Sequence, residues 1–323
     1  MTGISDSFQR PINYLRISVT DRCNLRCVYC MPAEGVPLMP RSNILRYEEI
    51  EAVARAAATL GIAKVRLTGG EPLVRAQLSR LVRMLSKIEG IDDISLTTNG
   101  LLLARYAAEL KDAGLKRVNV SLDTLKRDRF ERITRGGKLD DVLKGMKEAR
   151  RVGLVPVKVN MVVMRGVNDD EILDFGRMTI EHGWHVRFIE PMPFAAELAF
   201  VSVGEIREQL LSLGPLHPYP FSPGNGPAKY FRFSEAPGTV GFIGSITEHF
   251  CFNCNRLRLT ADGQLHPCLL SDKEVDLRQP LRQGASPEEL SRLIKQAVAA
   301  KPERHLLAQG ALPRGRPMCQ VGG

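Results

Sequence analysis

A chain of 323 residues is long enough to bury one large α/β core or two smaller ones without disulfide staples. Its hydrophobic share of 44% and charged share of 25% are ordinary for a soluble globular protein. No apolar run approaches the roughly 18 residues that span a bilayer, and the first residues lack a signal-peptide pattern. A membrane protein is therefore excluded, and a cytoplasmic location is expected.

The net charge of +9 predicts that the protein attracts anions, either nucleic acid or a small polyphosphate. Aromatic residues make up only 6% of the chain, and no basic run is interleaved with aromatics as in a base-stacking groove. The composition therefore favours a small anion, and no nucleic-acid partner is expected.

From Tyr14 onward the chain repeats a strand, a turn and a helix, which predicts parallel strands with right-handed crossovers. The clearest helix covers Tyr47 to Leu60, with Gly61 as its C-terminal cap. The predicted strands are Tyr14 to Thr20, Lys64 to Thr68, Asp93 to Thr98, Arg117 to Leu122, Val155 to Val163 and His185 to Glu190. Six such units predict an α/β fold with a partial (βα)₆ TIM-like barrel.

Polar and apolar side chains alternate along five of these strands, although buried parallel strands are usually apolar throughout. A half-exposed strand alternates too, so one strand alone decides little. The polar positions are Tyr14, Arg16, Ser18 and Thr20, then Arg66 and Thr68, Asn119 and Ser121, Lys158 and Asn160, and His185 and Arg187. Together they predict a wet, cationic barrel interior, with ligands at the C-terminal ends of the strands.

After Pro191 the pattern changes, and prolines and glycines gather between residues 214 and 238. Short strands are expected near Lys229 to Phe233 and Thr239 to Ile243, and a helix from about Pro287. We therefore divide the chain into a barrel of residues 1–194 and a smaller, irregular C-terminal region of residues 195–323.

The first cysteine set, Cys23, Cys27 and Cys30, follows the first strand with the spacing C-x₃-C-x₂-C. Three thiolates can hold three corners of a zinc site or an iron–sulfur cluster, and the fourth corner is left open for another ligand. The alternatives are a zinc knuckle completed from elsewhere and three ordinary core cysteines.

The second set is Cys251, Cys254 and Cys268, and an Asp262-Gly263 hairpin turn should bring its last member back to the others. A strand from Cys254 to Leu259 would put Arg256 and Arg258 on the face of Cys254. These arginines either balance the charge of the metal site or bind an anionic substrate. A zinc ribbon completed by His266 is the alternative. Cys319 matches no motif and is taken as a free thiol.

The run Cys23-x₃-Cys27-x-Tyr29-Cys30-Met-Pro, followed by Thr68-Gly-Gly-Glu-Pro72, resembles the motifs of radical S-adenosylmethionine enzymes. The resemblance implies that the three cysteines hold a [4Fe–4S] cluster whose fourth iron binds S-adenosylmethionine. It also implies that the Gly-Gly-Glu turn holds the amino group of this cofactor. A Gly-Gly pair by itself marks only a turn.

The run C-x₂-C-N-R-L-R-L-T-A-D-G-x₄-C, together with the terminal Gly-Gly, narrows the resemblance to the GTP 3′,8-cyclase family of molybdenum cofactor biosynthesis. Further matching motifs are Thr-Thr-Asn-Gly, Ser-Leu-Asp and Gly-Val-Asn-Asp-Asp-Glu, and only residues 194–238 show little likeness. The implied reaction takes hydrogen from C3′ of GTP with a 5′-deoxyadenosyl radical and then joins C3′ to C8. Its product is (8S)-3′,8-cyclo-7,8-dihydroguanosine 5′-triphosphate.

The resemblance also implies residue roles. Cys23, Cys27 and Cys30 would hold the first [4Fe–4S] cluster, and Cys251, Cys254 and Cys268 an auxiliary [4Fe–4S] cluster whose open iron binds guanine. Tyr29, Gly70, Ser121 and Met192 would contact S-adenosylmethionine. GTP would contact Arg16, Arg66, Thr97, Lys158, Arg256 and Arg258, and the catalytic group would be Arg256, Arg258 and the tail residues Gly322 and Gly323.

The implied partners are GTP, an electron donor and the downstream cyclic pyranopterin monophosphate synthase, with the enzyme acting as a monomer or homodimer. Two alternatives stay open. The first is another radical enzyme with an auxiliary cluster, acting on a peptide or other substrate. The second is a zinc-dependent nucleic-acid-binding module.

Overall fold

In the part of the chain that the structure describes, one continuous twelve-stranded sheet organises the fold, in the order β12-β11-β10-β1-β2-β3-β4-β5-β6-β9-β8-β7. The computed structural model describes residues 3–192, 199–220, 226–305 and 316–322. The strands are β1 (Tyr14–Ser18), β2 (Lys64–Thr68), β3 (Asp93–Thr98), β4 (Arg117–Ser121), β5 (Lys158–Val162), β6 (His185–Ile189), β7 (Leu216–Pro218), β8 (Lys229–Phe233), β9 (Thr239–Ile243), β10 (Arg256–Leu259), β11 (Gln264–His266) and β12 (Val275–Asp276).

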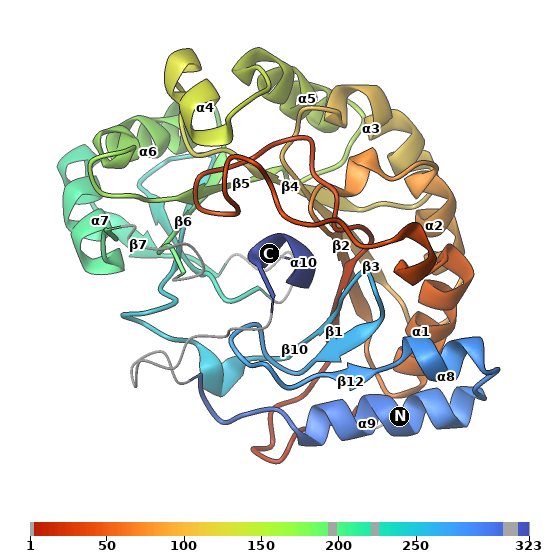
Figure 1. Cartoon of the computed structure of the whole chain (residues 1–323). Helices are drawn as coiled ribbons and strands as arrows, with labels where there is room; N and C mark the ends of the chain where they lie inside the picture. Colours follow the sequence, from red (N-terminus) through yellow and green to blue (C-terminus); the bar gives the residue numbers. More distant parts are fainter. Residues whose placement is uncertain (1–2, 193–198, 221–225, 306–315, 323) are drawn as a thin grey trace.

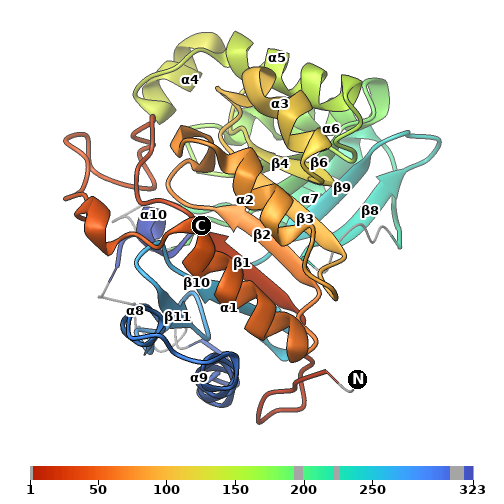
Figure 2. The same cartoon turned by 90° about the vertical axis from the view of Figure 1, so that its right-hand side faces the viewer.

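Every pairing from β10 through β1–β6 to β9 is parallel, and the strands curl into an open barrel with helices on the outside (Figures 1 and 2). The helices are α1 (Tyr47–Thr59), α2 (Leu78–Leu85), α3 (Leu103–Asp112), α4 (Arg127–Thr134), α5 (Leu139–Arg151), α6 (Ile172–Glu181), α7 (Val203–Leu210), α8 (Arg278–Arg282), α9 (Pro287–Ala299) and α10 (Met318–Val321). The predicted partial barrel is confirmed. No helix of the described ranges is long and apolar enough to cross a bilayer.

The predicted elements agree closely with the observed ones. All six predicted barrel strands form, although four of them are shorter at their ends than expected. β5 begins only at Lys158, after Pro156, which has no backbone N–H to donate to a ladder. Apolar residues such as Leu15 and Ile17 are buried in the core between sheet and helices, so the polar face of each strand is turned to the interior.

Strands from the later part of the chain join both sides of the six-stranded barrel. β9 pairs in parallel with β6, and β10 pairs in parallel with β1. Helix α9 packs against α1 on the outside. The division at residue 194 falls within 193–198, outside the described residues, and remains a proposal.

Candidate active site

The first cysteine set lies in the loop that follows β1, at the C-terminal end of the parallel strands. The Cys30 backbone N–H donates to the Cys27 carbonyl at 2.9 Å, and the Arg26 guanidinium donates to the Cys23 carbonyl at 2.8 Å. All three thiols line one cavity. Burial raises the pKa of Cys23 to about 12, so binding of a metal here would release protons.

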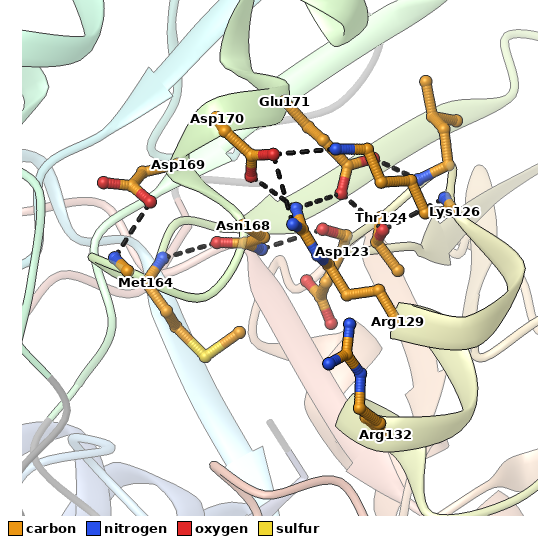
Figure 3. A network of polar contacts seen from close by, with 12 residues as sticks. Asp123, Thr124, Lys126, Arg129, Arg132, Met164, Asn168, Asp169, Asp170 and Glu171 are labelled. Atoms are coloured by element: carbon orange, nitrogen blue, oxygen red, sulfur yellow. Dashed lines mark hydrogen bonds and ion pairs between the residues drawn. The ribbon is translucent and has the colours of Figure 1, made fainter.

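Tyr29 of this loop is held by a carboxylate from the end of β4. Its hydroxyl donates to Asp123 Oδ2 at 2.7 Å, and Asp123 Oδ1 accepts the Val162 N–H at 2.8 Å. Burial raises the pKa of Asp123 to about 6. Buried Asn168 supports the arrangement, since its amide donates to the Asp123 carbonyl at 2.8 Å (Figure 3) and to the Val162 carbonyl at 2.9 Å.

The Gly-Gly-Glu turn after β2 packs directly on the cysteine loop. Backbone N–H groups of Gly70 and Glu71 donate to the carbonyls of Thr20 and Arg22, both at 2.8 Å. A Cβ atom on Gly70 would lie 2.4 Å from the Arg22 carbonyl oxygen, so only glycine fits. The Glu71 carboxylate accepts the Thr98 hydroxyl and the Asn99 N–H, both at 2.7 Å, which ties the turn to the end of β3.

Three arginines form a row across neighbouring strands. Arg258 of β10 is in register with Arg16 of β1, which is in register with Arg66 of β2. All three line the cavity that the first cysteine set also lines. Burial and the charge of Arg256 lower the pKa of Arg258 to about 10. Such crowding of like charges is costly unless an anion occupies the space between them.

Further buried polar groups face the same cavity. Among the described residues, no hydrogen-bond partner contacts the side-chain amide of Asn119, Arg66 Nε or Arg187 Nε. Buried polar atoms are normally bonded, so these donors and acceptors indicate a polar ligand that the cavity is built to hold. Lys158 of β5 is also buried, although it does not line the cavity, and burial lowers its pKa to about 6, helped by the nearby charges of Arg187 and Arg66.

The second cysteine set lies on a 3₁₀ turn, Cys251–Asn253, and just after the β10–β11 hairpin. Gly263 has a φ of +85° in the hairpin turn, as the Asp-Gly signal predicts. Burial raises the pKa of Cys254, but the charges of Arg256 and Lys301 outweigh it and lower this pKa to about 6. A thiolate held ready in this way suits metal ligation.

Two expectations about this region change. Cys254 is the C-terminal cap of the 3₁₀ turn and stands outside β10, which begins at Arg256. The Nε2 atom of His266 lies 3.1 Å from the Glu274 carboxylate, so the ring is directed toward Glu274. No three His, Cys, Asp or Glu side chains of the described ranges meet at the distances of a single-ion site. A four-iron cluster takes one thiolate per iron and therefore needs a wider spacing.

The structure gathers most of the predicted site residues. The cavity is lined by Arg16, Cys23, Cys27, Tyr29, Cys30, Arg66, Gly70, Thr97, Ser121, Met192, Arg256 and Arg258. Lys158 is buried but is not among the lining residues, and neither are the three cysteines of the second set. Gly322 reaches the arginine row through its carbonyl, which accepts from Arg258 at 2.6 Å and Arg16 at 3.3 Å. Gly323 lies outside the described residues.

Other residues at the site are absent from the predicted set. Asp123, Asn119, Asn160 and Arg187 line the cavity, and so does Cys319, which is buried beside the first cysteine loop. Strand alternation already placed Asn119, Asn160 and Arg187 on the interior face. Asp123 is the last residue of the Ser-Leu-Asp motif that begins at Ser121, and this motif is the signal that points to it.

Comparison with known proteins agrees with this geometry. The family model of the radical SAM superfamily matches residues 17–178, and that of Molybdenum Cofactor Synthesis C matches residues 184–307. A GTP 3′,8-cyclase of Pelotomaculum thermopropionicum is 56% identical over 99% of this chain and 100% of its own length. One of Moorella thermoacetica is 53% identical over the same shares. The structure of Streptococcus suis SuiB bound to S-adenosylmethionine has a TM-score of 0.61, with 16% identity over 83% of this chain and 64% of that one.

The open parallel barrel, with three cysteines after its first strand, is that of a radical S-adenosylmethionine protein. Within that superfamily, the sequence identity to GTP 3′,8-cyclases over the full length of the relatives decides the family, because one fold is shared by enzymes of many activities. The chain belongs to the family of GTP 3′,8-cyclases.

Proposed function

We propose that this protein converts GTP to (8S)-3′,8-cyclo-7,8-dihydroguanosine 5′-triphosphate in the first step of molybdenum cofactor biosynthesis. The observation that carries the proposal is the row of Arg258, Arg16 and Arg66 in a cavity that the first cysteine set also lines. A triphosphate, with a charge of about −4, supplies the anion that such a row needs.

The residues fit the cofactors that the family uses. Cys23, Cys27 and Cys30 would hold the first [4Fe–4S] cluster, since three thiols face one cavity and leave one iron open. The cluster and S-adenosylmethionine together supply a 5′-deoxyadenosyl radical. Tyr29, fixed by Asp123, and Gly70, whose backbone N–H donates to the Thr20 carbonyl, would form the walls that orient the cofactor. Ser121 and Met192 complete this group of lining residues.

The arginines would bind and orient the substrate rather than exchange protons. Arg66 and Arg16 offer guanidinium N–H groups to phosphate oxygens, and paired N–H groups match such oxygens in two-point contacts. Asn119 offers both a donor and an acceptor that have no partner among the described residues. Fixing the triphosphate at one end of the cavity would hold the ribose near the first cysteine set, which is the positioning that hydrogen abstraction requires.

The second cysteine set would hold an auxiliary [4Fe–4S] cluster beside the substrate. Arg256 links it to the cavity, because this residue lines the cavity and its guanidinium lies 3.9 Å from Cys254 Sγ. Cys251 and Cys268 complete the set. A one-electron donor, a downstream cyclic pyranopterin monophosphate synthase and a monomeric or homodimeric state belong to the same proposal.

The test is to follow the hydrogen. The anaerobically reconstituted protein is incubated with reductant, S-adenosylmethionine and GTP deuterated at C3′, and 5′-deoxyadenosine is analysed by mass spectrometry. Deuterium in 5′-deoxyadenosine is the expected result, and the Cys27→Ala variant should form no 5′-deoxyadenosine. Unlabelled 5′-deoxyadenosine, formed equally without GTP, would contradict the proposed substrate and favour another radical reaction.

A further inference from the structure

A buried lysine is in contact with the second cysteine set. Lys301 follows helix α9 and is only 4% exposed. Its Nζ lies 2.7 Å from the Pro267 carbonyl oxygen, 2.8 Å from the Arg256 carbonyl oxygen and 3.4 Å from Cys254 Sγ. An ammonium group has three N–H donors and no acceptor, so the three neighbours use its full capacity.

These three contacts fall on different parts of the cysteine set. Cys254 belongs to the Cys251-x₂-Cys254 pair, Arg256 is the first residue of strand β10, and Pro267 immediately precedes Cys268 at the end of the hairpin. One side chain therefore fixes the separation of the second and third cysteines, which are 14 positions apart in sequence.

A second buried cation holds the first cysteine of the set. Arg10 Nη1 donates to the carbonyls of Cys251 at 2.6 Å and Glu303 at 2.8 Å, and Nη2 donates to that of Pro302 at 2.7 Å. The carboxylate of Asp6 forms an ion pair with Arg10 at 2.6 Å. Arg10 therefore forms an ion pair with a carboxylate, that of Asp6. The three contacts of Lys301 given above are instead with two backbone carbonyls and with Cys254 Sγ, a thiol of the second cysteine set.

We infer that Lys301 is a positioning residue for the auxiliary cluster: it holds the second cysteine set in its ligating arrangement and sets a fixed positive charge against the Cys254 sulfur. This inference rests on the proposed function, because it requires that the set binds a cluster. Reduction adds negative charge to a cluster, and a nearby cation stabilises the reduced form. Lys301 therefore raises the reduction potential of the auxiliary cluster and leaves that of the first cluster unchanged.

The test compares three substitutions in the full-length, cluster-loaded protein. Lys301→Gln removes the charge, Lys301→Arg keeps it, and Lys295→Gln removes an exposed lysine from the same α9 segment as a matched control. Both clusters are titrated with reductant and followed by electron paramagnetic resonance, and iron and sulfide are counted. The first cluster serves as an internal reference in every sample.

The expected result is a lower auxiliary potential in Lys301→Gln, or loss of the auxiliary iron alone, with recovery in Lys301→Arg and no change in Lys295→Gln. Lys301→Met is a second neutral variant should Lys301→Gln fail to fold. A wild-type auxiliary potential in a neutral variant that keeps both clusters would overturn the inference. Wild-type protein that binds only about four irons would instead refute the auxiliary cluster itself.

Discussion

Arg258 and Arg16 lie opposite each other on adjacent parallel strands, and both donate to the carbonyl oxygen of Gly322, at 2.6 Å and 3.3 Å. The C-terminal segment is thus bound to the residues proposed to receive the substrate phosphates. A backbone carbonyl can accept from two guanidinium groups without adding a negative charge that would compete with phosphate.

The arginine row should dominate substrate affinity. We expect Arg258→Ala and Arg66→Ala each to weaken GTP binding by about 10- to 100-fold, since a charge-assisted hydrogen bond contributes roughly 1.5–3 kcal/mol. Isothermal titration of the cluster-loaded protein measures the dissociation constant. Arg127→Ala, which removes an exposed arginine paired with Asp140, is the control and should leave binding unchanged. Equal affinity in all three variants would refute the assignment of these arginines to GTP.

The tail should tolerate no side chain at Gly322. Its φ is +73°, and an added Cβ would lie 2.8 Å from Thr68 Cγ2. We expect Gly322→Ala to release the tail from the arginines and lower GTP turnover at least tenfold, while 5′-deoxyadenosine is still formed. Gly284 is a matched control, because its φ is +84° and nothing lies within 4 Å of an added Cβ. Equal turnover in the two alanine variants would show that the tail contact is dispensable.

The two cysteine sets should have separable tasks. Cys268→Ser is expected to retain cleavage of S-adenosylmethionine, because Cys23, Cys27 and Cys30 are untouched, and to abolish formation of the cyclised nucleotide. Liquid chromatography quantifies 5′-deoxyadenosine and the nucleotide product in the same sample. Loss of 5′-deoxyadenosine from this variant would mean that the sets do not act independently.

Lys158 should make GTP binding depend on pH. Burial and the neighbouring arginines lower its pKa to about 6, so much of it is neutral at pH 7 before an anion arrives. A triphosphate bound near Lys158 should favour its charged form and raise this pKa, so binding is expected to take up a proton. Affinity should therefore be highest near pH 6 and fall above it, by at most about tenfold per pH unit.

Calorimetry in buffers of different ionisation enthalpy measures this proton uptake directly. Lys158→Met should lose the uptake and flatten the pH dependence above pH 6, which separates the lysine from the titration of the nucleotide itself. Lys144→Met removes a lysine from helix α5 and serves as the control. Proton uptake that persists in Lys158→Met would assign it to another group.

Asn168 should matter for stability as well as for the position of Tyr29. It is fully buried, donates to the carbonyls of Asp123 and Val162, and accepts the Met164 N–H at 2.7 Å. Asn168→Ala leaves these three backbone groups without their hydrogen-bond partner, so urea denaturation should show that the free energy of unfolding falls by about 2–4 kcal/mol. The neighbouring Asp169→Ala, which removes one bond to Gly166 at the surface, should cost less than about 1 kcal/mol. Equal losses of stability in the two variants would show that the hydrogen bonds of Asn168 do not stabilise the fold.

The sequence is informative where a local pattern carries the structure. The alternation shared by five strands identified Arg16, Arg66 and Ser121 as interior residues, and all three line the cavity. The spacing of the cysteines and the Asp262-Gly263 signal similarly located both thiol sets and the hairpin that joins Cys254 to Cys268.

Long-range contacts carry no such pattern. Asp123 acts on Tyr29 across 94 positions, and Lys301 acts on Cys254 across 47, and neither pair has a fixed spacing that a reader of the sequence could test. The displacement of Cys254 from the strand has a local cause, since the preceding 3₁₀ turn uses it as a cap. These residues become visible only when the barrel brings distant loops together.

The order of the strands also constrains how the protein is made. Until Thr239–Ile243 and Arg256–Leu259 have left the ribosome, β6 and β1 each present an unpaired edge. Exposed edges of this kind recruit other chains, so the nascent barrel is prone to aggregation through most of its synthesis. Ribosome-bound chains that stop before Thr239 should therefore need a chaperone, and expression should improve when synthesis of the last third is fast.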